Sequence, residues 1–319
     1  MWGIRNLISA VAFTVVASAP AGAETLLQPG LRLAIAPGDT APALALTLDA
    51  CDGKADHRII DLLVVERIPA TIFATARWLK RNPDTVRLLV THPDLFEIEN
   101  HGARHLPAVD QPVSVYGLKA AGSPAGVTAE IAGGAAAVQA ATGKTPHWYR
   151  GATALYTAES LKQIAALHHE VAGYSIAADG GASFSAGLTE KTMLAAKAGD
   201  VLLAHVNHPE KAAGAGVAKA LLALKAKGYR FVRLADARPH IMPPKHVVLN
   251  TPAVTPPLHP ALAAAAPKPA SPPSARAVPE RAEPTVAAEK AALPPCPEVA
   301  HAPGLGPARH PGLVKKPVP

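Results

Sequence analysis

Two histidines stand four residues apart in the segment Glu-Asn-His-Gly-Ala-Arg-His at positions 99–105. On one helical turn this spacing places the imidazoles of His101 and His105 on the same face, where both can bind one metal ion at about 2.0–2.1 Å. A chance pair of surface histidines is the alternative, because the chain contains 14 histidines. The residue after His101 is glycine, where zincin proteases carry a general-base glutamate, so that class of metalloenzyme is excluded.

A divalent ion also favours a carboxylate ligand, and the segment Thr-Leu-Asp-Ala-Cys-Asp-Gly at 47–53 offers two aspartates. Asp49 ends an apolar run, where a carboxylate is costly to bury without a partner, so its position favours a functional role. The alternative role of a loop or helix cap suits Asp52 or Asp56 better than Asp49.

These side chains need a scaffold that brings distant segments together, and the middle of the chain predicts one. Short apolar runs alternate there with segments of helical period, which is typical of repeated β/α units. The predicted strands are 43–48, 71–74, 95–99, 147–149, 171–176, 201–204 and 230–234. The predicted helices are 57–66, 83–89, 128–141, 158–168 and 211–227. We therefore expect an α/β fold, a distorted β/α barrel of about seven strands, with an open doubly wound sheet as the alternative.

In a β/α barrel, chemistry takes place just past the C-terminal ends of the strands. The unusual polar residues of this chain fall at those points, each ending or following a predicted strand: Asp49, His101, Arg150, Asp179 and His205. We expect them to converge on one site.

Five short motifs occur in order along this region. They are Thr-Leu-Asp ending at Asp49, the histidine segment at 99–105, Trp-Tyr-Arg-Gly at 148–151, Asp179, and Leu-Leu-Ala-His ending at His205. Together they resemble the NodB-homology domain of polysaccharide deacetylases, carbohydrate esterase family four, over about residues 40–237. The resemblance implies a distorted β/α barrel that removes acetyl groups from N-acetylated or O-acetylated polysaccharides or oligosaccharides.

The resemblance also implies one divalent metal, most often Zn²⁺, with Co²⁺ or Ni²⁺ as substitutes. His101 and His105 match the metal ligands, and Asp49 matches the catalytic base. His205 matches the catalytic acid. Arg150 is similar to the residue that orients the base, and Asp179 to the carboxylate that tunes the acid.

Three motifs depart from the family pattern. Asp49 is followed by Ala50 where the family has two adjacent aspartates, so the metal carboxylate has to come from elsewhere; Asp52 is the first candidate, with Asp56 and Cys51 behind it. Arg-Gly-Ala-Thr at 150–153 replaces Arg-x-Pro-Tyr, and glycines without a tryptophan follow Asp179. These departures favour, as an alternative function, a degenerate domain that binds polysaccharide without turnover. An esterase or amidase with a non-sugar substrate would use the same site.

The start of the chain predicts export. Arg5 precedes an apolar run at 7–19, followed by Pro20 and small residues up to Ala23, which is typical of a signal peptide at 1–23. The run is shorter than the roughly 20 residues that span a bilayer, so we expect no membrane span after cleavage, a retained anchor being the alternative. The folded domain is then expected at 24–240, in the periplasm or outside the cell.

The end of the chain predicts a disordered tail. Residues 241–319 hold 20 of the 33 prolines and no aromatic residue, a composition that cannot bury enough apolar surface to fold. The tail carries 8 basic and 4 acidic residues, so it supplies more than half of the formal charge of +7. That charge does not indicate a nucleic-acid partner for the folded domain. It would suit contact with an anionic cell envelope, and a solvated spacer is the alternative.

Overall fold

The computed structural model describes residues 24–34 and 42–249. Eight strands form one parallel sheet: β2 (Ala43–Ala50), β3 (Ala70–Ala74), β4 (Phe96–Asn100), β7 (Trp148–Tyr149), β8 (Glu170–Val171), β9 (Ile176–Ala177), β10 (Val201–His205) and β11 (Arg230–Val232). The predicted signal peptide at 1–23 and residues 250–319 of the predicted tail lie outside the described residues.

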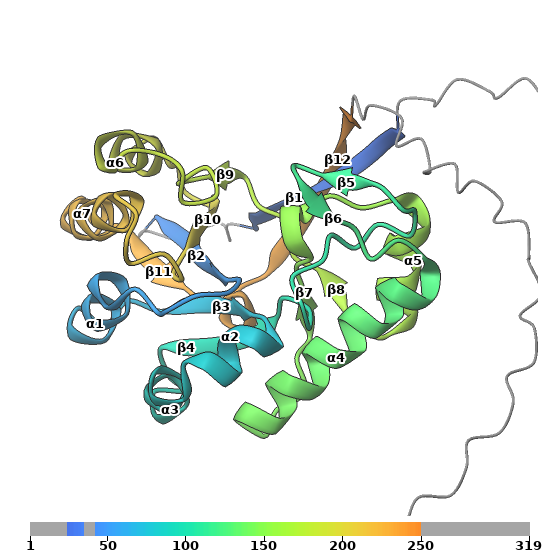
Figure 1. Ribbon diagram of the computed structural model, residues 1–319. Coiled ribbons are helices and arrows are strands. Elements are labelled where there is room, and N and C mark those ends of the chain that lie inside the picture. Colours follow the sequence, from blue (N-terminus) through green and yellow to red (C-terminus); the bar gives the residue numbers. More distant parts are fainter. Residues whose placement is uncertain (1–23, 35–41, 250–319) are drawn as a thin grey trace, which may run out of the picture. The chain divides into compact units, whose positions relative to one another are not determined.

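Seven of these strands follow one path in the order β8-β7-β4-β3-β2-β10-β9, and β11 pairs with the start of β2. The sheet curls into a parallel half-barrel, which confirms the predicted α/β barrel type (Figure 1). β2 lies at its centre and is buried along its whole length, as expected for an apolar strand in a parallel sheet covered on both faces.

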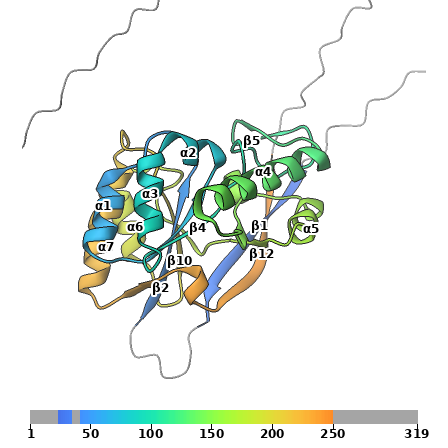
Figure 2. The same ribbon diagram turned by 90° about the horizontal axis from the view of Figure 1, so that it is seen from below.

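Helices cover the outside of the sheet. They are α1 (His57–Val65), α2 (Ala76–Arg81), α3 (Pro83–Thr91), α4 (Pro124–Thr142), α5 (Ala158–Ala166), α6 (Ala186–Leu194) and α7 (Ala213–Ala226). Two short 3₁₀ turns, η1 (Ala152–Ala154) and η2 (Leu234–Asp236), complete the helical elements of the described residues. α1, α3, α6 and α7 lie along one side of the sheet (Figures 1 and 2), and the largest apolar cluster packs between them and the central strands. None of the helices in the described ranges is long and apolar enough to cross a membrane.

The strand predicted at 171–176 is in fact two short strands, β8 and β9, at opposite ends of the sheet. The chain between them crosses the open side of the half-barrel, so one continuous strand cannot form there. Gly173 makes this crossing close to the backbone of Pro29, since an added Cβ would lie 2.3 Å from the Pro29 carbonyl oxygen.

A two-stranded antiparallel ribbon of β1 (Glu24–Leu33) and β12 (Pro239–Leu249) lies beside the sheet (Figure 2). Residues 241–249, which composition alone places in the tail, form most of β12. The remaining strands are β5 (Ser114–Val115) and β6 (Leu118–Lys119), a small hairpin in the long connection after β4. The ribbon, the hairpin, α2 and α6 are elements that the sequence pattern did not predict.

Candidate active site

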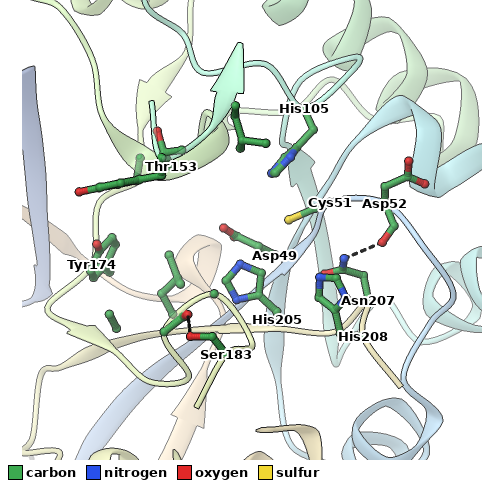
Figure 3. Close-up of a pocket in the computed structure, with 17 residues that line it drawn as sticks. Asp49, Cys51, Asp52, His105, Thr153, Tyr174, Ser183, His205, Asn207 and His208 are labelled. Carbon is green, nitrogen blue, oxygen red and sulfur yellow. Dashed lines mark hydrogen bonds between the residues drawn. The ribbon is translucent and has the colours of Figure 1, made fainter. Parts of the chain in front are cut away.

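The C-terminal ends of the parallel strands open into a pocket of about 850 Å³ (Figure 3). Its lining residues are Asp49, Cys51, Asp52, His105, Tyr116, Leu118, Thr153, Ala154, Tyr174, Ala177, Gly180, Gly181, Ser183, Leu203, His205, Asn207 and His208. The strand ends of β2 and β10 supply Asp49 and His205, which are register partners in the sheet. This is the place at which a β/α barrel is expected to carry its chemistry.

Cys51, His101 and His105 form a compact group with one ligand atom each, and these atoms lie within 4.8 Å of one another. Cys51 Sγ is 3.4 Å from His101 Nε2, and the two imidazole rings have centroids 5.0 Å apart. His101 Nδ1 lies 2.6 Å from the carbonyl oxygen of Arg150. Because a carbonyl only accepts hydrogen bonds, Nδ1 carries a proton, and in neutral His101 the lone pair of Nε2 points toward Cys51.

The histidine segment is not the helical turn that its spacing suggested. Residues 101–105 form an irregular loop after β4, in which Gly102 has φ 88° and His105 has φ 63°. The positive φ angles of Gly102 and His105 replace a helical turn here, and the bond to the Arg150 carbonyl fixes the His101 ring.

Two buried side chains hold this loop in place. Glu130 of α4 accepts hydrogen bonds from the backbone amides of Arg104 and Leu106, on either side of His105, at 2.8 and 3.1 Å. Asn100 accepts from the Gly102 amide at 2.8 Å. Neither residue was among the site residues expected from the sequence, and both fix the direction of metal-binding candidates.

The third member of the group is Cys51, and not Asp52, which the sequence favoured. The Asp52 carboxylate accepts from the Gly53 amide at 2.7 Å and lies 3.1 Å from Arg81 Nε, with 42% of its side chain exposed. Asp56 is also engaged elsewhere, because it caps the start of α1 and pairs with Arg58. Burial opposes the thiolate of Cys51, but the neighbouring histidines hold the pKa of this thiol well below its ordinary value.

Asp49 and Arg150 form a buried ion pair beside this group, and Asp49 reaches the pocket. Arg150 Nη1 donates to Asp49 Oδ1 at 2.9 Å, while the other guanidinium nitrogens donate to the carbonyls of Ala172 and Gly173 at 3.0 Å. The guanidinium also lies over the Phe73 ring, 4.2 Å from its centroid. Burial opposes the charge on Asp49, but His101 and Arg150 outweigh it, and the pKa of Asp49 is lowered. Asp49 is therefore held as an oriented carboxylate whose Oδ2 lies 3.7 Å from His101 Nε2.

His205 and Asp179 form the second charged pair. His205 Nδ1 lies 3.0 Å from Asp179 Oδ1, and the His205 amide donates to Asp179 Oδ2 at 2.7 Å. Asp179 is fully buried, whereas His205 reaches the pocket. Burial opposes the charged imidazole, but Asp179 and Cys51 raise the pKa of His205 well above its ordinary value.

Two further residues that line the pocket were not expected from the sequence: Thr153 in the turn after Arg150, and Asn207 after β10. Thr153 and Ala154 have φ angles of 68° and 51°, a strained conformation for a β-branched residue such as threonine. The Thr153 hydroxyl oxygen is buried and has no hydrogen-bond partner among the described residues. Asn207, which follows β10, donates to the Asp52 carbonyl at 2.5 Å and lines the pocket. Thr153 and Asn207 carried no sequence signal beyond their place next to motifs.

Comparison with known proteins identifies the domain. Residues 37–172 match the family described as polysaccharide deacetylase. Over these residues the chain is similar to polysaccharide deacetylases. No match was found among curated proteins.

Solved structures of polysaccharide deacetylases share the fold. A carbohydrate esterase family four pseudoenzyme from Bacillus anthracis aligns with 17% identity and a TM-score of 0.50. The alignment covers 62% of this chain and 65% of the length of that protein. The peptidoglycan deacetylase PdaC from Bacillus subtilis aligns with 19% identity and a TM-score of 0.51, over 62% of this chain and 90% of that one. The Bc1960 peptidoglycan N-acetylglucosamine deacetylase aligns with 21% identity and a TM-score of 0.52, over 66% and 91%. Both active enzymes and a pseudoenzyme therefore share this fold.

Polysaccharide deacetylases are typically metal-dependent, and the residues of this chain fit such an ion. The Cys51, His101 and His105 group offers one thiolate and two imidazoles, a donor set that Zn²⁺ accepts. The bond from His101 Nδ1 to a backbone carbonyl is the usual support of a metal-binding histidine.

Proposed function

We propose that this chain is a metal-dependent deacetylase that removes acetyl groups from an N-acetylated or O-acetylated polysaccharide or oligosaccharide. One observation carries the proposal: an oriented carboxylate, Asp49, and a carboxylate-paired imidazole, His205, line the same pocket as Cys51 and His105 of the Cys/His/His group (Figure 3). Hydrolysis of an acetyl group needs a base for the attacking water and an acid for the leaving group, and these two residues suit those roles.

Asp49 is the proposed base. Arg150 engages its Oδ1, which leaves Oδ2 on the side of His101 to accept a proton from water in the pocket. Arg150 acts through Asp49 as a positioning residue, because its own nitrogens are fully engaged by Asp49, Thr47 and two backbone carbonyls.

Cys51, His101 and His105 are the proposed ligands of the metal, with Zn²⁺ as the expected ion. When bound, such an ion supplies a water of lowered pKa and polarises the acetyl carbonyl.

His205 is the proposed acid. Asp179 binds Nδ1 and keeps the imidazole protonated, so that Nε2 can deliver a proton to the leaving amine or alkoxide. The products are acetate and the free amino or hydroxyl group of the sugar.

A second function is favoured by one observation. Ala50 stands where the family carries its metal carboxylate, so the domain can have lost turnover and kept polysaccharide binding. Metal analysis separates these functions, because a binding relic does not require a stoichiometric ion.

The test is acetate release by the zinc-loaded protein from chitooligosaccharides, peptidoglycan and acetylated xylan. We expect Asp49→Asn to lower kcat by about 10²–10⁴-fold, the usual contribution of a general base. The same variant should keep its zinc, because Asp49 is not a member of the Cys/His/His group. Zinc-loaded wild-type protein that releases no acetate from any of the three substrates would falsify the proposal.

The place of action is part of the same proposal. The residues at 1–23 predict export, which would bring the enzyme to acetylated polymers outside the cytoplasm. Fractionation of producing cells, with N-terminal sequencing of the mature chain, tests whether cleavage follows Ala23.

A further inference from the structure

The β5–β6 hairpin places an exposed aromatic ring at the edge of the pocket. Tyr116 is 69% exposed and lines the pocket together with Leu118, which is 37% exposed. A single exposed apolar residue on a protein surface needs no explanation. Two further observations make Tyr116 different.

The first observation is the backbone of the turn. Strand pairing of Val115 with Leu118 leaves a two-residue loop, Tyr116-Gly117, in which both φ angles are positive, at 49° and 82°. This is the φ pattern of a type I′ turn, whose first position favours asparagine, aspartate or glycine. Tyrosine there costs conformational free energy, and strain of this kind gathers at binding sites.

The second observation is that the hairpin is firmly anchored although its tip is exposed. Val115 and Ala120 are almost fully buried in a small apolar cluster with Leu26 of β1 and Leu155. The Ala120 and Gly122 amides donate to the carbonyls of Val113 and Val109 at 3.0 and 2.9 Å. The ring of Tyr116 is thus presented by a rigid support, which lowers the entropy lost on binding.

The pocket has room for more than an acetyl group. Its volume of about 850 Å³ lies toward the upper end of the ~300–1,000 Å³ that is typical of ligand pockets. Tyr174 lines the same pocket as Tyr116. An aromatic face and hydroxyl groups together suit a sugar ring, which has an apolar C–H face and a polar edge.

We propose that Tyr116 forms a sugar-binding subsite, in which its ring stacks on a pyranose of the substrate chain next to the residue that is deacetylated. The proposal rests on the proposed function and deepens it, since it assigns the residue that holds the polymer rather than the acetyl group. N-acetylated glycans such as chitin and peptidoglycan are the substrate class that it commits to.

Tyr116→Asn provides a sharp test, because asparagine fits the turn better than tyrosine does. We expect the thermal midpoint of unfolding to stay the same or rise. Binding to insoluble chitin or peptidoglycan, measured by co-sedimentation of the full-length chain, should weaken about tenfold, the effect of one stacked ring. The KM for acetate release from chitopentaose should rise by a similar factor, with a smaller change in kcat. Tyr116→Phe keeps the ring and should stay within about twofold of wild type on both measurements.

Lys119→Ala is the matched control, because Lys119 is exposed on the same hairpin and does not line the pocket. It should leave binding and KM unchanged. The inference is overturned if Tyr116→Asn binds both glycans as tightly as wild type, or if the wild-type chain binds neither. If the chain releases no acetate but binds glycan in a Tyr116-dependent way, the subsite stands and the deacetylase function falls.

Discussion

Cys51 sets the character of the proposed metal site, because it brings a thiolate next to Ala50, the position at which the family pattern has a carboxylate. It is 7% exposed and lies at the end of β2, beside His101 and within reach of His105. A thiolate is a softer donor than a carboxylate, and it favours Zn²⁺ over the hard ions Mg²⁺ and Ca²⁺. We therefore expect the site to bind Zn²⁺ in preference to Mg²⁺ and Ca²⁺.

Substitution with Co²⁺ tests the ligand set without measuring activity. We expect the wild-type cobalt protein to show a near-ultraviolet thiolate-to-cobalt charge-transfer band, and Cys51→Ser to lose it. Zinc affinity should fall by at least about 100-fold in Cys51→Ser, since even an outer-shell partner is worth about 10–100-fold. Asp52→Asn is the control and should keep the band and one zinc per chain. If Asp52→Asn loses the ion and Cys51→Ser keeps it, the ligand set is the one that the sequence favoured.

Most charged residues of the site could be located from the sequence, because a carboxylate or imidazole at the end of an apolar strand is costly without a partner. Asp49 and His205 follow this rule and lie where strand ends meet. The preference for Asp52 over Cys51 came from the general frequency of carboxylate ligands. What the sequence does not show is that Arg81, on the unexpected helix α2, lies beside the Asp52 carboxylate.

At the scale of the elements, the segment after α5 contains a buried histidine, His169, that is held in its neutral form. His169 follows α5 and is 8% exposed, and its Nδ1 has no hydrogen-bond partner within the described part of the chain. Burial lowers the pKa of His169 below its ordinary value of 6.5; a hydrogen bond to the His147 backbone opposes this shift without cancelling it. A charged histidine that caps the helix would suit this place in the sequence, but burial favours the neutral form.

This lowered pKa makes the stability of the fold depend on pH in a defined direction. Between the lowered pKa and 6.5, the unfolded chain binds more protons at His169 than the native chain does, so the free energy of unfolding falls as the pH drops through this range. We expect His169→Gln to flatten the decrease in unfolding free energy between pH 7.5 and 5, measured by urea denaturation. His57→Gln, on the exposed end of α1, should leave the wild-type pH dependence in place. If the unfolding free energy of His169→Gln changes with pH as steeply as that of wild type, then His169 binds protons as readily in the native chain as in the unfolded one.

Most long elements could be predicted from the sequence, whereas several of the short ones could not. The central strands β2, β3, β4 and β10 and the helices α1 and α7 follow from their apolar pattern, and α4 follows from its high alanine content. β8 and β9 have two residues each, too few to show a strand period, so the sequence pattern merged them. Their separation is a property of the closing barrel, in which the chain must cross from one sheet edge to the other.

At the scale of the whole domain, the β1–β12 ribbon joins segments from the two ends of the described chain. β1 pairs with β12 from Glu24–Leu249 to Leu33–Pro239, with one irregularity, and β1 also contacts the crossing after β8 through Leu31 and Tyr174. Leu26 and Leu31 of this ribbon are fully buried. The sequence could not reveal this pairing, because the two strands lie far apart and β12 contains prolines that composition assigns to a tail.

Truncation distinguishes the ribbon from the rest of the predicted tail. A chain that ends at Leu249 keeps β12, and its midpoint of thermal unfolding should stay within about 2 °C of the full chain, because the composition of 250–319 predicts no packing. A chain that ends at Arg238 loses the partner of β1 and uncovers Leu26 and Leu31. At about 1.5–3 kcal/mol for each buried leucine, this loss should leave the domain unfolded or insoluble.

Leu26→Ala in the full chain is a milder change, and it should lower the free energy of unfolding in urea by about 2–5 kcal/mol. A chain ending at Arg238 that keeps the full midpoint would show that the ribbon is dispensable, and a large loss on ending at Leu249 would show that residues 250–319 pack against the domain.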